Sequence, residues 1–107
     1  MIKGKQSIAF DTSPYIEASA SVVGKKEGEG PLGSMFDMVE QDDMFGENTW
    51  EEAESTMQKE ACLLALGKAH LTAGAVRYLF GGDLLRQGVA TSMGVETLQI
   101  PMFGLYG

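Results

Sequence analysis

The feature that most constrains this fold is an alternation of strand-like, turn-like and helix-like segments in the last third of the chain. Val76–Phe80 is short, nearly continuously apolar and rich in β-branched and aromatic residues, which favours a strand covered on both faces. Gly81 and Gly82 end it, because glycine permits a sharp change of direction. The small-residue segment Gly88–Leu98 is predicted to be a helix, and Ile100–Tyr106 the next strand. Such a strand–helix–strand unit is right-handed and has parallel strands.

The first third of the chain carries weaker strand signals. Gln6–Phe10 is predicted to be a strand, and Tyr15–Val23 a second one that alternates between larger apolar and small polar residues. These two runs either pair as a hairpin or form one bent strand. Gly24–Gly33 is predicted to be a loop, since four glycines in ten residues disfavour a regular element.

Two helices are predicted in the middle of the chain, a short amphipathic one over Ser34–Gln41 and a long one over Thr49–Lys68. Thr49 and Glu52 have the spacing of a capping box. Six residues recur at helical spacing on one expected apolar face: Trp50, Ala53, Met57, Ala61, Leu64 and Ala65. The order of elements predicts an α/β fold, with covering helices on a mixed or parallel sheet.

Composition excludes several classes of function. The net charge of −7 disfavours nucleic acids and anionic membranes, which both need a basic patch. The single cysteine and single histidine cannot form a disulfide, a histidine-based triad or a zinc site. Acidic residues dominate the span 37–60, where Lys59 is the only basic residue. We expect a solvated surface there, with divalent-cation binding as the alternative.

Three sequence words resemble the stage V sporulation protein AD family, thiolase-like proteins of spore-forming bacteria. They are A-S-A-S-V-V-G-x-K-E-G-E-G-P-L-G at 18–33, G-D-L-L-x-Q at 82–87 and I-P-x-F-G-L-Y-G at 100–107. The resemblance runs from about Gly4 onward. It implies that residues 1–107 are a partial N-terminal domain of a layered thiolase-like fold, which ends before the turn that carries the thiolase-type cysteine. Cys62 precedes the Gly82-Asp83 turn and is no substitute, so we expect no enzymatic activity.

The resemblance also implies a function, which is to bind dipicolinic acid or its calcium chelate and to assist its uptake into the spore. It implies membrane proteins of the same operon as partners, a homo-oligomer, and a place at the spore inner membrane. No cofactor is expected. The alternatives are a fragment of a thiolase-like or ketoacyl-synthase-like acyltransferase, and a non-catalytic interaction fragment.

Four residues are candidates for ligand binding. Arg86 has the geometry to grip a carboxylate of dipicolinate through paired hydrogen bonds, and Gln87 to donate one more. Asp83 either binds calcium or caps the following helix. Lys26, within the glycine-rich segment, is a weaker candidate. No catalytic residue and no resident metal site is predicted.

Overall fold

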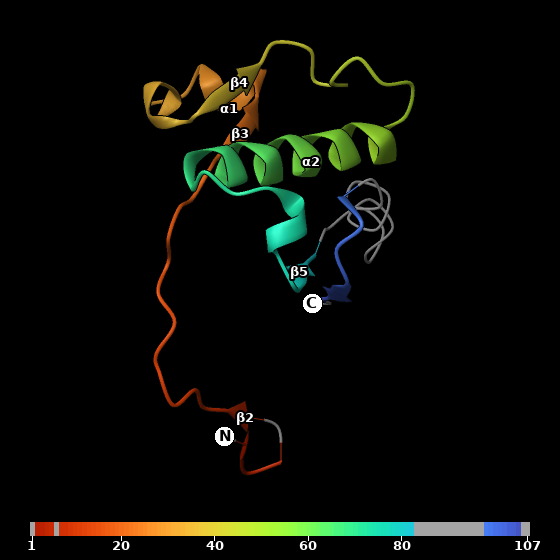
Figure 1. The fold of residues 1–107 in the computed structure, drawn as a ribbon. Helices are drawn as coiled ribbons and strands as arrows, with labels where there is room; N and C mark the ends of the chain where they lie inside the picture. Colours follow the sequence, from red (N-terminus) through yellow and green to blue (C-terminus); the bar gives the residue numbers. More distant parts are fainter. Residues whose placement is uncertain (1, 6, 83–97, 106–107) are drawn as a thin grey trace.

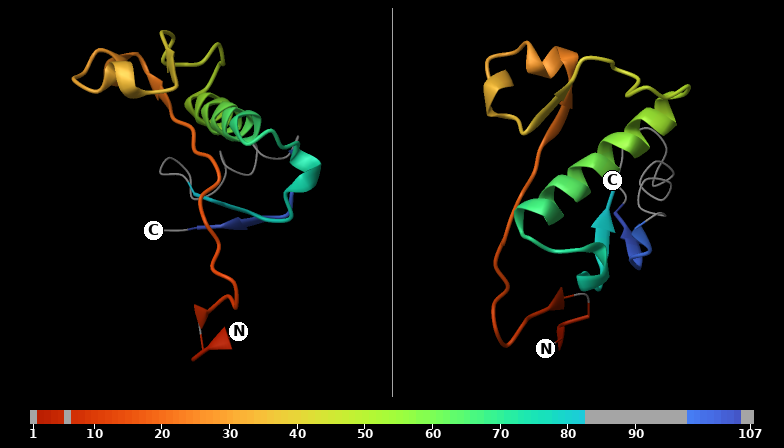
Figure 2. Two further views of the ribbon diagram at one scale, coloured as in Figure 1. Left: turned by 60° about the vertical axis from the view of Figure 1, so that its left-hand side comes forward. Right: turned by 45° about the horizontal axis from the view of Figure 1, so that its top comes forward.

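The computed structural model describes residues 2–5, 7–82 and 98–105 and has a mixed α/β architecture (Figure 1). Its elements are β1 (Ile2–Lys3), β2 (Ser7–Ile8), β3 (Val22–Gly24), α1 (Lys25–Gly28), η1 (Gly33–Met35), β4 (Met38–Glu40), α2 (Trp50–Lys68), η2 (Ala73–Ala75), β5 (Leu79–Gly81) and β6 (Met102–Gly104). The strands form three pairs, β1–β2, β3–β4 and β5–β6. Helix α2 lies between the β3–β4 and β5–β6 pairs (Figures 1 and 2).

Helix α2 begins and ends where the sequence predicts. The Thr49 hydroxyl accepts a hydrogen bond from the Glu52 backbone N–H at 3.1 Å. The Glu52 carboxylate accepts from the Asn48 N–H at 3.3 Å, one residue earlier than in a capping box. Trp50, predicted to lie on the apolar face, is 59% exposed, whereas Ala53 is buried. The first turn of the helix thus lies at the edge of the packed region.

The C-terminal end of α2 is closed by a Schellman motif with histidine at its left-handed position. The His70 N–H donates to the Gly67 carbonyl at 3.1 Å, and the Leu71 N–H donates to the Leu66 carbonyl at 2.9 Å. His70 has a φ of 57°, where a side chain with Cβ is strained. The motif satisfies the last carbonyls of the helix at the expense of that strain.

We expect His70→Gly to raise the free energy of unfolding by about 1 kcal/mol, because glycine adopts this conformation without a Cβ clash. Denaturant titration followed by circular dichroism measures the change. His70→Ala is the control, since it removes the imidazole and keeps the Cβ. An equal gain from both variants would show that the imidazole, and not the backbone strain, is responsible.

The β3–β4 pair differs from the predicted pattern. The two strands are parallel, with Val22 opposite Met38 and Gly24 opposite Glu40. The helix predicted over Ser34–Gln41 is therefore wrong: this stretch contains the end of η1 and strand β4. Pairing with β3 overrides the local amphipathic pattern, because the Met38 N–H donates to the Ser21 carbonyl at 3.1 Å and extends the chain.

Two further predictions for the first half of the chain are corrected. Only the end of the strand predicted over Tyr15–Val23 is a strand, and it pairs with β4 rather than with the first run. The first run itself contains β2, which pairs antiparallel with β1. The loop predicted over Gly24–Gly33 contains one turn of helix, α1.

Glycines allow the connection between β3 and β4 to fold tightly onto itself. A Cβ added at Gly28 would overlap the Val39 side chain of β4, and one added at Gly33 would overlap the Gly28 carbonyl. The Gly33 N–H also donates to the Gly30 carbonyl at 3.1 Å. These close approaches give a physical reason for the spacing of glycines in the K-E-G-E-G-P-L-G word.

A polar cluster fixes the β3–β4 pair to the end of α2. The Asp37 carboxylate accepts from the Ser21 N–H at 2.7 Å and from the Lys68 ammonium at 2.6 Å. Lys68 also donates to the Ser19 carbonyl at 2.9 Å. We call Asp37, Ser21 and Lys68 the Asp37 cluster. The acidic run was expected to be solvated, but this member of it has a specific partner 31 residues away.

The Asp37 cluster should make the stability of the fold depend on pH. The hydrogen bond from Lys68 and then that from the Ser21 N–H lower the pKa of Asp37 below its ordinary value of 3.8. A lowered pKa in the folded state stabilises the fold above pH 3.8, and this contribution is lost as the pH falls through the folded pKa. We expect Asp37→Asn to destabilise the chain at neutral pH and to have little effect in stronger acid.

Urea unfolding of the wild type and Asp37→Asn across this pH range measures the difference. Asp11→Asn is the control, because Asp11 is an exposed aspartate in a bend outside the cluster. A difference between wild type and Asp37→Asn that persists unchanged well below pH 3.8 would contradict the assignment.

The β5–β6 pair confirms the parallel arrangement predicted for the last third of the chain. Leu79, Phe80 and Gly81 lie opposite Met102, Phe103 and Gly104. Strand β5 begins later than predicted, because residues 73–75 form η2 and Val76 follows it as its cap. The predicted helix Gly88–Leu98 lies almost entirely outside the described residues.

Very few side chains of the described part are buried. Within it, the buried hydrophobic residues are Phe45, Ala53 and Ile100. The radius of gyration is 15.5 Å, against about 13 Å for a compact domain of this length. The β5–β6 pair exposes large aromatic rings, with Phe80 66% and Phe103 51% exposed. These rings stack across the pair at 5.4 Å between centroids.

Candidate functional site

The candidate site is a cleft between α2 and the carboxyl end of β5, which we call the α2–β5 cleft. Its volume is about 500 Å³. It is lined by Glu54, Met57, Gln58, Ala61 and Cys62 from α2 and by Phe80, Gly81 and Gly82 at the end of β5. Because Gly81 lies opposite Gly104, the carboxyl ends of both strands meet at this edge. Open α/β sheets bind their ligands at such an edge.

The backbone at this edge is held in place by hydrogen bonds and by close contact. The Leu105 N–H donates to the Gly81 carbonyl at 2.7 Å, while at the opposite, amino end of the pair the Leu79 N–H donates to the Pro101 carbonyl at 2.9 Å. A Cβ at Gly82 would lie 2.7 Å from the Leu105 carbonyl oxygen. Glycine at position 82 therefore lets the backbone after β5 pass close to the backbone after β6.

The described part of the α2–β5 cleft lining is mostly apolar, with two polar side chains from α2. Gln58 supplies an amide that both donates and accepts, and Glu54 supplies a carboxylate. Among the described lining residues there is no cation. A ligand that is neutral overall, or one that brings its own cation, suits this lining better than a free dianion.

Cys62 lies in the wall between the α2–β5 cleft and a second, smaller hollow, which we call the apolar cavity. Burial raises the pKa of the Cys62 thiol above its ordinary value of 9.0. The group is therefore a neutral thiol at physiological pH, whereas nucleophilic cysteines are activated by a lowered pKa. Among the residues that the structure describes around it, none lowers the pKa of Cys62 to prepare it for covalent chemistry.

Of the four predicted binding residues, the structure describes only Lys26. Lys26 is exposed on α1, which belongs to the β3–β4 side of α2, and it is not among the residues that line the α2–β5 cleft. Asp83, Arg86 and Gln87 lie outside the described residues. The chain enters that segment from Gly82, which itself lines the cleft.

Sequence reasoning missed Glu54 and Gln58 as lining residues. The sequence pattern that could have indicated them is the spacing of positions 54, 57, 58 and 61, which lie on one face of a helix at i, i+3, i+4 and i+7. The stripe mixes a carboxylate, an amide and two apolar residues. Such a mixture is also typical of an ordinary surface face, so the sequence alone does not single it out.

The acidic run does not form a metal site within the described residues. The described part of the chain contains no group of three or more potential metal ligands. Asp42 instead organises a turn: its carboxylate accepts from the Met44 N–H at 3.0 Å and from the Gly46 N–H at 2.8 Å. Asp42 is thus the residue that holds the turn between β4 and α2. In the described ranges, no helix has the length and apolar character needed to cross a membrane.

Together these features define an α/β protein whose candidate cleft lies at the carboxyl edge of a parallel strand pair. Residues 4–107 match the model of the Stage V sporulation protein AD (SpoVAD) family, and the chain belongs to that family. It is 33% identical over 106 residues to Stage V sporulation protein AD of Bacillus subtilis (strain 168). The match covers 99% of this chain and 31% of the relative, so the chain spans about a third of that protein's length. Membership of this family supports a role in sporulation.

Proposed function

We propose that the chain helps to bind dipicolinic acid, as the free acid or its calcium chelate, for uptake into the developing spore. The observation that carries the proposal is family membership over residues 4–107. The α2–β5 cleft adds a place for the ligand, since about 500 Å³ falls within the ordinary range for small-molecule pockets. In this proposal the fold is thiolase-like and the role is binding rather than catalysis.

The lining of the cleft favours the calcium chelate over the free dianion. Dipicolinate carries two carboxylates beside a ring nitrogen, and one calcium ion neutralises both charges. The Glu54 carboxylate repels a dianion and attracts calcium, and the Gln58 amide can donate to a ligand carboxylate. The ring of the ligand suits the apolar remainder of the lining.

The segment that follows Gly82 supplies the proposed charged contacts. Arg86 grips one carboxylate of the ligand through paired hydrogen bonds, Gln87 donates another, and Asp83 binds the calcium ion. Lys26, on the other side of α2, contributes only by long-range attraction. The neutral Cys62 thiol supports a non-catalytic role against the alternative of an acyltransferase fragment.

The proposal extends to location and partners. The protein acts at the inner membrane of the forespore or spore, beside membrane proteins of the same operon, and as a homo-oligomer. The exposed aromatic face of the β5–β6 pair supports an interacting role, because an apolar face of this kind is normally covered. An interaction fragment without ligand binding is the second candidate function, and the same observation favours it.

We expect Arg86→Ala to weaken the binding of calcium dipicolinate roughly tenfold to a hundredfold, because a hydrogen bond to a charged group contributes about 1.5–3 kcal/mol. Titration calorimetry with calcium dipicolinate and with the sodium salt measures the affinity. Arg77→Ala is the matched control, since Arg77 lies over the Tyr78 ring and not in the cleft. Equal affinities for the wild type and Arg86→Ala would contradict the role of Arg86. If the wild type does not bind calcium dipicolinate at all, the second candidate function, an interaction fragment without ligand binding, would be favoured instead.

A further inference from the structure

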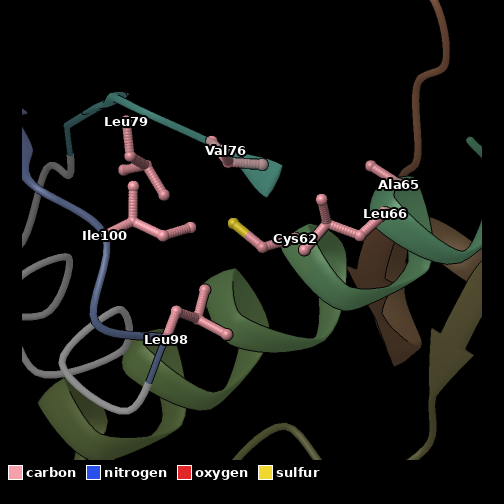
Figure 3. Close-up of a pocket in the computed structure, with 7 residues that line it drawn as sticks. All are labelled: Cys62, Ala65, Leu66, Val76, Leu79, Leu98 and Ile100. Carbon is pink, nitrogen blue, oxygen red and sulfur yellow. The ribbon is translucent and has the colours of Figure 1, made fainter. Parts of the chain in front are cut away.

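We draw no further inference here: the strongest candidate, the apolar cavity that Cys62, Leu79 and Ile100 line between α2 and the chain around the β5–β6 pair (Figure 3), carries no proposal, because it is an apolar groove and nothing in the described part of the structure shows what covers it.

Discussion

Replacing Gly33 by alanine is expected to destabilise the β3–β4 pair by about 3 kcal/mol, the upper end of the usual cost of overpacking. The added Cβ would overlap the backbone carbonyl of Gly28, which belongs to α1. A backbone carbonyl cannot rotate away as a side chain can. The connection between the two strands must therefore open, and the register that places Val22 opposite Met38 is lost.

Amide hydrogen exchange measures this effect where it arises. The Met38 N–H, which donates to the Ser21 carbonyl, should exchange roughly a hundredfold faster in Gly33→Ala if the pair opens locally. Gly67→Ala is the matched control, because a Cβ at that position of α2 meets nothing within 4 Å. Identical protection of Met38 in Gly33→Ala and wild type would show that the connection adapts without opening the pair.

Replacing Gly28 by alanine is expected to cost about 2 kcal/mol, within the usual range for overpacking. The obstacle here is the Val39 side chain of β4, which is β-branched and limited to few rotamers. Because the clash involves a side chain, a second substitution can relieve it. The free energy of unfolding of Gly28→Ala should therefore recover in part when Val39 is also replaced by alanine.

A double-mutant cycle tests this coupling. Denaturant unfolding compares the single variants Gly28→Ala and Val39→Ala with the double variant. The double variant should be destabilised by less than the sum of the two single variants, with a difference of about 1 kcal/mol or more. Strictly additive effects would mean that Gly28 and Val39 do not limit each other. The contact of α1 with β4 would then be loose.

The elements that were predicted well carry their own local signals. Helix α2 has a capping threonine at Thr49 and a continuous helical run as far as Lys68, and both ends agree with the structure. The parallel β5–β6 pair was predicted from two apolar runs, and each of the two strands ends at a glycine. The segment between them, Gly88–Leu98, is a prediction that the described residues do not test.

The elements that were predicted poorly depend on distant partners. Strand β4 has an amphipathic helical pattern in its sequence, and it is extended because β3 and Ser21 supply hydrogen bonds from 16 residues away. The role of Asp37 depends in the same way on Lys68. Glu54 and Gln58 line the cleft only because the end of β5 lies against α2. None of these contacts has a signature within its own segment.

Helix α2 has a consequence for how the chain melts. It forms the common wall of both parallel pairs, and the Asp37 cluster fastens its last turn to one of them (Figure 2). Two-stranded parallel ribbons have little stability by themselves, so each pair depends on the helix rather than on the other pair. The cooperativity of this part of the protein therefore resides in a single helix, and fraying of its final turn would turn one melting unit into two.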